Sequence, residues 1–146
     1  MTILLKNKQT LQIDNFTFKC CIGRGGLTKI KREGDKKTPR GFFEIGNLYF
    51  RYDRINRPIT SLKCVKINKN MGWCNDLNFP KKYNKIFKIS KKIKHEKLTR
   101  KDSNYDFLIP INYNVNKVKK NKGSAIFIHI TKIYKKTLGC VAIKRK

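Results

Sequence analysis

Apolar and polar residues alternate near the N-terminus of the chain. The segment TLQIDNFTFKC, residues 10–20, carries apolar side chains at every second position on either side of Asp14-Asn15. A period of two is typical of a strand with one buried face, and the Asp-Asn pair suits a tight turn. The pattern therefore predicts two short strands joined at residues 14 and 15, as the start of a β-meander.

Three later segments also have strand composition: GFFEIGNLYFRYDR (41–54), YDFLIPINYNV (105–115) and GSAIFIHI (123–130). The glycine-rich residues 21–41 predict a long ordered loop or a pair of turns, and residues 73–84 are rich in turn formers. The one helix that we expect lies within SKKIKHEKLTRKD (90–102), where Ser90 can cap it. Residues 1–146 are thus predicted to form a single, mainly β domain with one or two short helices.

Charge adds a second kind of information. Lysine and arginine number 36 against 9 aspartates and glutamates, which gives a formal net charge of +27. Such an excess is typical of proteins that bind polyanions. The basic residues are mostly lysines in a chain also rich in asparagine and isoleucine, so a compositional bias of the genome is an equally good explanation. Both interpretations stay open at this point.

Cysteine spacing and the N-terminal segment limit the function classes. The five cysteines show no CxxC pair, so no metal site is expected, and a complete set of disulfides would leave one thiol over. The opening MTILLKNKQ is too short an apolar run for a secretory signal, and no segment has the length of a membrane span. From the sequence alone, the compartment stays unknown.

A histidine and a cysteine near the C-terminus are the candidate chemical groups. His129 lies in an apolar run, and Cys140 follows Gly139 at the end of a lysine-bearing loop. A nearby imidazole can take the proton of a thiol, and a glycine permits a turn that aims backbone amides at a developing oxyanion. Together these features describe acyl transfer, but one cysteine and one histidine in a β protein are by themselves a weak signal. The alternative is a buried core histidine beside a small buried thiol.

Five ordered motifs resemble the L,D-transpeptidase (YkuD) catalytic domain, in its short single-domain bacterial branch. They are GRGGLTKIKREGDKKTPRGFFEIG (23–46), GWCNDLNFPKKYNK (72–85), HEKLTRKDSNYD (95–106), IPINYN (109–114) and GSAIFIHI with TLGCVAI (123–130 and 137–143). Together they extend over nearly the whole chain, and five motifs in order are more specific than one Cys-His pair.

The resemblance implies a β-sandwich in which Cys140 is acylated by a peptidoglycan stem peptide and His129 is its base, with no cofactor or metal. Thr137 and Gly139 match the nucleophile turn, where the Gly139 and Cys140 amides would supply the oxyanion donors. Glu33 and Asp35 are expected to fix a turn through backbone amides. The residues expected near the substrate groove are Trp73, Asp76, Tyr83 and Asn84.

The resemblance also carries expectations about partners and location. The expected partners are a stem peptide or muropeptide and, as a second class, anionic wall polymers, with no specific nucleic acid and a monomeric chain. The family implies the periplasm or cell wall, although no signal peptide is visible. A catalytically silent basic β-domain that binds an anionic polymer is the alternative function.

Two departures from the family pattern concern the C-terminal end. Leu138 and Ala142 occupy positions where many members have a histidine and a polar or basic residue. Members usually continue into a further helix and strand, so we expect the chain to be shortened at its C-terminus. In that case Val141 and Ile143 would lack a cover on one apolar face.

Overall fold

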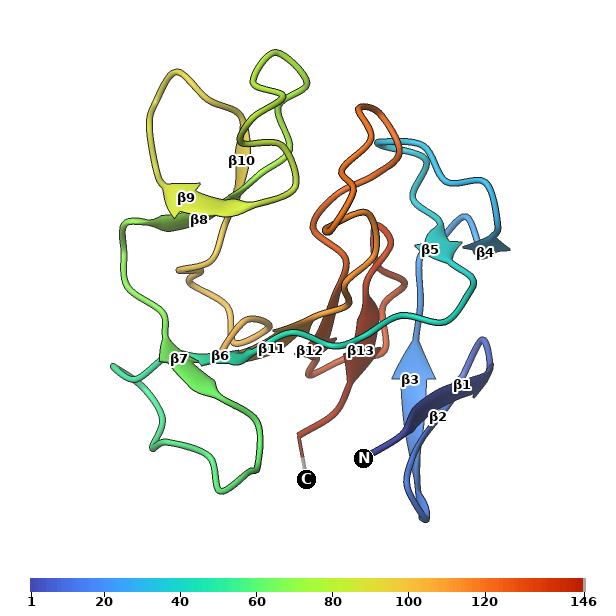
Figure 1. Ribbon diagram of the computed structural model, residues 1–146. Coiled ribbons are helices and arrows are strands. Elements are labelled where there is room, and N and C mark those ends of the chain that lie inside the picture. The colour runs from blue at the N-terminus through green and yellow to red at the C-terminus, as the bar shows by residue number, and fades with distance from the viewer. Residues whose placement is uncertain (146) are drawn as a thin grey trace.

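A computed structural model describes residues 1–145, and within them it contains thirteen strands and no helix (Figure 1). The strands are β1 (Ile3–Asn7), β2 (Thr10–Ile13), β3 (Phe16–Cys21), β4 (Leu27–Thr28), β5 (Thr38–Pro39), β6 (Leu48–Phe50), β7 (Cys64–Lys66), β8 (Met71–Cys74), β9 (Ile86–Lys88), β10 (His95–Lys97), β11 (Phe107–Pro110), β12 (Phe127–Ile130) and β13 (Val141–Ile143). The prediction of a mainly β fold of the sandwich type is confirmed.

The predicted helix within residues 90–102 is wrong, because the middle of this segment forms β10. This strand pairs antiparallel with β8, with His95 opposite Cys74. Ile93 and Leu98 are both buried, with 6% and 0% of their surface exposed. On a helix, residues five positions apart point about 140° away from each other, so one amphipathic face could not cover both. Pairing with β8 therefore outweighs the local helix signal.

Eight strands form one mixed sheet, in the order β1-β2-β3-β13-β12-β11-β6-β7. Near its centre β12 and β13 run parallel, with Ile128 opposite Val141 and His129 opposite Ala142. A separate three-stranded sheet has the order β10-β8-β9, and β4 pairs with β5. In Figure 1 the three-stranded sheet lies above the β6 and β7 end of the main sheet.

Side chains of the central strands alternate between two buried clusters, as the strand period of two requires. Phe127, Leu108 and Cys140 belong to the first cluster, which also takes Trp73 from β8. Ile128 and Val141, which point the other way, belong to the second cluster. The main sheet is therefore covered on both faces, and Cys140 lies on the face that carries the three-stranded sheet.

The N-terminal hairpin β1–β2 covers the second cluster. Leu11 of β2 is 2% exposed and packs in the same cluster as Val141, which is 3% exposed. Ile143 is half-buried and packs against this cluster too. The expectation that Val141 and Ile143 would lack a cover is therefore wrong. The cover comes from the sheet's own edge, because β3 pairs with both β2 and β13 and the strands twist across it.

The predicted turn at Asp14-Asn15 and the predicted turns within the glycine-rich residues 21–41 are both present. Asp14 adopts a positive φ of 49° in the two-residue connection between β2 and β3, as the Asp-Asn pair predicted. Within the glycine-rich segment, β4 and β5 pair parallel, with Leu27 opposite Thr38. The turn between them is closed by Asp35, whose carboxylate accepts the backbone N–H groups of Arg32 and Lys37 at 2.8 and 2.9 Å.

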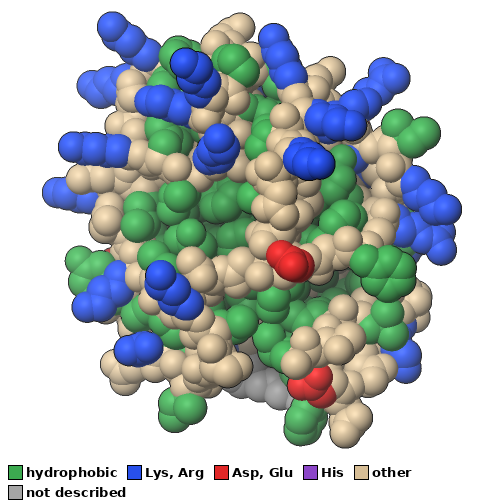
Figure 2. All heavy atoms as spheres, in the orientation of Figure 1, with side chains coloured by type: hydrophobic (Ala, Val, Ile, Leu, Met, Phe, Trp, Pro, Cys, Tyr) green, Lys and Arg blue, Asp and Glu red, His purple; other side chains and the backbone are tan. Residues whose placement is uncertain are grey.

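On the face that Figure 2 shows, positive charge is spread rather than gathered at one place. Figure 2 shows apolar side chains across the middle of the viewed face, lysines and arginines projecting around its margin, and few acidic groups. No segment of residues 1–145 forms a helix long and apolar enough to span a bilayer.

Replacing Leu11 by alanine tests the role of the N-terminal hairpin. Because Leu11 is buried against the second cluster, Leu11→Ala should lower the free energy of unfolding by about 2–5 kcal/mol. The matched control is Leu4→Ala in the same hairpin, since Leu4 is 50% exposed and its loss should cost less than about 0.5 kcal/mol. Urea unfolding measures both. Equal effects would contradict a covering role.

Candidate functional site

The parallel register of β12 and β13 brings the predicted pair, His129 and Cys140, to one face of the sheet. Ile128 pairs with Val141, so Cys140 stands level with Phe127, just before β13 begins. The Phe127 N–H donates to Cys140 Sγ over 3.4 Å, which agrees with this alignment. Because side chains alternate along a strand, His129 and Cys140 are diagonal neighbours on the face of the first cluster.

The turn before Cys140 is held by hydroxyl groups. Thr137 Oγ1 donates to the Cys140 carbonyl over 2.6 Å and accepts the Gly139 N–H at 3.1 Å. Thr38 Oγ1 donates to the Gly139 carbonyl over 2.7 Å and accepts the Gly23 N–H at 2.9 Å. Gly139 has a φ of 141°, and a Cβ there would lie 3.0 Å from the Lys37 carbonyl oxygen. The predicted need for glycine before the cysteine thus has a steric cause.

The Cys140 thiol lies in an apolar site. Burial raises its pKa to about 12, while the Phe127 N–H and the charge of Lys31 act in the opposite direction. The thiol S–H donates to the Ala125 carbonyl over 3.4 Å. At neutral pH the resting group is therefore the thiol, and a thiolate needs a base to form.

The imidazole of His129 lies on the same face of the sheet as the thiol. Burial lowers its pKa from 6.5, so the imidazole is neutral at pH 7. Its Nδ1 lies 2.8 Å from the Ile130 carbonyl oxygen, which can only accept, so Nδ1 carries the proton and Nε2 has a free lone pair. The ring of Tyr105 packs edge-on against the imidazole, with centroids 5.3 Å apart. This arrangement fixes the tautomer and the ring plane.

Asn84, one of the four residues expected near the substrate, is instead a buried connector. Its Oδ1 accepts Trp73 Nε1–H at 2.8 Å and the Ala125 N–H at 3.1 Å. Its Nδ2 donates to the carbonyls of Tyr113 and Asn114 at 3.1 and 2.7 Å. Asn84 is 1% exposed, so it joins β8 to the segment that leads into β12.

Tyr83 and Asp76 also make contacts within the protein. The Tyr83 hydroxyl donates to Glu33 and accepts the Gly123 N–H, and Ser124 Oγ donates to the same Glu33 oxygen. Burial and the Glu33 carboxylate raise the pKa of Tyr83. Asp76 accepts the backbone N–H groups of Asn78 and Lys94, both at 2.9 Å. Glu33 thus meets side chains rather than the predicted backbone amides.

Ala125, whose N–H is bound by Asn84, has a backbone φ of 54°. Such a value is unusual for a residue with a Cβ. A residue in this region costs of order 1–3 kcal/mol and persists where its surroundings fix it. Asn84 holds the Ala125 N–H, and the Ala125 carbonyl accepts the Cys140 thiol. Asn84 therefore positions the residue whose carbonyl accepts the Cys140 thiol.

The family model of the YkuD L,D-transpeptidase catalytic domain matches residues 1–146. The chain belongs to this family. No curated protein and no solved structure matches the chain. Membership makes the protein an L,D-transpeptidase-type transferase of the cell wall, which acts on peptidoglycan.

A cavity of about 490 Å³ adjoins the first cluster of this L,D-transpeptidase domain. Tyr49 and Trp73 line it, and both belong to the buried cluster that contains Cys140. The Trp73 ring packs edge-on against Phe127, with centroids 5.2 Å apart. Of the four predicted groove residues, only Trp73 reaches this cavity; Asp76, Tyr83 and Asn84 do not line it.

In this L,D-transpeptidase domain, two residues beside the His129 and Cys140 site were not identified from the sequence. They are Lys31 and Tyr105. Lys31 is 4% exposed, forms a 2.6 Å ion pair with Asp35, and lowers the pKa of Cys140 by its charge. Tyr105 packs against both His129 and Phe127. Lys31 lies within the family motif at residues 23–46, but that motif holds several lysines, so its burial is what distinguishes it. Tyr105 lies within a family motif, which was the signal available.

Asn84→Ala tests the positioning role in this L,D-transpeptidase domain. The change leaves buried donors at Trp73 and Ala125 without an acceptor, so the free energy of unfolding should fall by about 3 kcal/mol. Acylation of Cys140 should also slow, because the Ala125 carbonyl loses its support. Urea unfolding and intact-mass kinetics measure the two effects.

The control is Asn116→Ala, which removes an exposed side chain of the same type and should change neither quantity. Unchanged acylation in a destabilised Asn84→Ala protein would reduce Asn84 to a purely structural role.

Proposed function

We propose that Cys140 is the acyl-accepting nucleophile and His129 its general base, in L,D-transpeptidase or L,D-carboxypeptidase chemistry on peptidoglycan stem peptides. The observation that carries the proposal is the β12–β13 register, which puts the imidazole and the thiol on one face as diagonal neighbours. Family membership supports the substrate class.

In the first half-reaction, Cys140 Sγ attacks a stem-peptide carbonyl while His129 Nε2 takes the thiol proton. The C–N bond breaks, the imidazolium returns the proton to the leaving amine, and a thioester remains on Cys140. In the second half-reaction an amine or water attacks the thioester. His129 takes a proton from this acceptor and returns it to the departing sulfur, which restores the thiol.

The pKa directions favour proton transfer during attack over a resting ion pair. Burial raises the pKa of Cys140 and lowers that of His129, so the neutral pair is the stable form before substrate arrives. The Gly139 N–H already donates to Thr137, which leaves the Cys140 N–H as the oxyanion donor that we propose.

The cavity lined by Tyr49 and Trp73 is the proposed place for the stem peptide. Tyr49 and Trp73 belong to the same buried cluster as Cys140, and the wall also carries Asn47 and Asn112, whose amide groups can both donate and accept hydrogen bonds. In this proposal Asp76, Tyr83 and Asn84 support the site from behind and do not touch substrate.

Cys140→Ala should abolish covalent acylation by a carbapenem and all turnover of a stem tetrapeptide, because the nucleophile is gone. The fold should persist, since a small buried side chain replaces another. Intact-mass spectrometry measures the adduct. The four remaining cysteines, of which Cys20, Cys21 and Cys74 are buried, serve as internal controls. An adduct that survives on any of them would refute the assignment.

His129→Ala should change the pH dependence of acylation. In the natural chain, the rate should rise with pH as His129 loses its proton, with a midpoint below 6.5 because burial lowers its pKa, and should be flat near pH 7. The variant should stay slow well above pH 8.5, since the pKa of Cys140 is raised to about 12. Adduct formation followed across pH measures both profiles. An unchanged rate at pH 7 would make His129 a core residue.

A further inference from the structure

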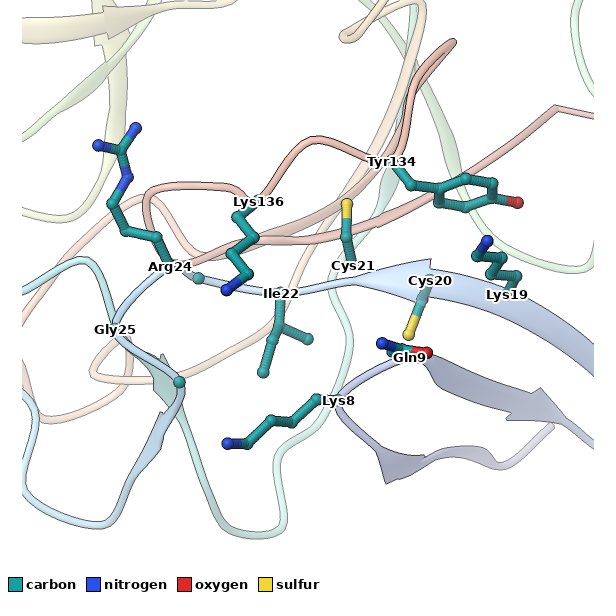
Figure 3. A pocket seen from close by; sticks show the side chains of 12 residues that line it. Lys8, Gln9, Lys19, Cys20, Cys21, Ile22, Arg24, Gly25, Tyr134 and Lys136 are labelled. Carbon is teal, nitrogen blue, oxygen red and sulfur yellow. The ribbon is translucent and has the colours of Figure 1, made fainter.

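A second cavity, of about 470 Å³, lies beside β3 and is lined by four cationic side chains (Figure 3). Lys8 comes from the turn between β1 and β2, Lys19 from β3, Arg24 from the glycine-rich segment and Lys136 from the loop before Cys140. All four are exposed. Segments far apart in the sequence thus converge on one space.

Four cations line this cavity and no acidic residue does. The chain has nine aspartates and glutamates, and none lines the cavity. Within residues 1–145, none of the four cations forms an ion pair, whereas Asp35, Asp53, Glu96, Asp102 and Asp106 pair with other cations. Like charges around one space repel, and a ligand with several negative charges would relieve that repulsion.

The side chains approach the space from different sides. In Figure 3 the ammonium ends of Lys8 and Lys136 lie on either side of Ile22, Lys19 stands near Cys20, and the guanidinium of Arg24 extends away from the two cysteines. Tyr134 forms a further wall, with the Lys19 ammonium 4.9 Å from its ring centroid. Lys8 and Lys136, which come from different segments and flank Ile22 in this view, are the pair chosen for the test below.

We propose that this cavity binds a multivalent phosphate group. A phosphate carries about −1.5 to −2 charges and oxygens that point in several directions, which suits point-like ammonium groups arriving from opposite sides. A single carboxylate carries one charge and would offset fewer of the four cations. Three of the four cations are lysines, and the one guanidinium points outward.

The site is distinct from the proposed catalytic pair, although the two are neighbours. Arg24 N–H donates to the Thr137 carbonyl and Thr137 N–H to the Ile22 carbonyl, both over 2.9 Å, so a strand-like bridge separates the cavity from the nucleophile turn. Phosphate binding does not need the thiol. Phosphate binding is therefore expected to persist in Cys140→Ala. If no phosphate bound, the acyl-transfer proposal would be unaffected.

The test compares two double variants with the same loss of charge. Lys8→Gln with Lys136→Gln should weaken binding of inorganic pyrophosphate by roughly tenfold or more, measured by calorimetry at low salt. Lys91→Gln with Lys117→Gln removes two exposed lysines that do not line the cavity, and should change affinity by less than about twofold. Equal losses in both variants would overturn the proposal, because net charge alone would then explain binding.

Two further measurements keep the test decisive. Amide shifts on titrating the natural chain with pyrophosphate should concentrate at Gly25, Gly26 and Tyr134, and shifts elsewhere would overturn the site even if a variant failed to fold. Citrate should bind more weakly than pyrophosphate, and equal binding would overturn the choice of phosphate.

A glycerol phosphate oligomer distinguishes the two sources of the phosphate group, which are an anionic polymer and a free phosphate compound. If the oligomer binds more tightly than pyrophosphate, and the Lys8→Gln, Lys136→Gln variant loses this binding, the ligand is a polymer. If the oligomer binds more weakly than pyrophosphate, the ligand is a free phosphate compound.

Discussion

The pairing of β12 with β13 is the interaction on which the rest of the molecule depends. It is a parallel pair near the centre of a mixed sheet, and its register sets which residues face each of the two cores. A shift of one residue would send His129 to the hairpin side and Ile128 to the catalytic side. The same register aligns Cys140 with Phe127, whose N–H meets the sulfur. Fold and candidate chemistry therefore share one constraint.

Burial gives the site its electrostatic character. It raises the pKa of the Cys140 thiol and lowers that of His129, so both groups rest uncharged in an apolar cluster. The nearby charges are themselves held: Lys31 by Asp35, and Glu33 by the hydroxyls of Tyr83 and Ser124. A frame of satisfied polar groups thus surrounds a pair of neutral side chains, His129 and Cys140.

The positive charge of the chain has two structural outcomes. Some cations are held in ion pairs or over aromatic rings, as Arg100 is with Asp102 and Tyr105. Others line a cavity without any acidic residue in its lining, beside the turn that carries Cys140. Composition accounts for the many lysines and for the rarity of acidic residues, and the fold adds the convergence of four cations from separate segments on one cavity.

The sequence by itself determined the β class, the turn at Asp14, the family and the candidate pair, because period-two patterning, turn chemistry and ordered motifs are local signals. It failed over residues 90–102, where pairing with β8 overrode a helix-like segment, and at Val141, whose cover comes from a hairpin more than a hundred residues away. Only the tertiary structure assigned Asn84 and Tyr83 to the support of Ala125 and revealed Lys31. Burial and hydrogen-bond partners depend on which distant segments meet, and no local pattern records that.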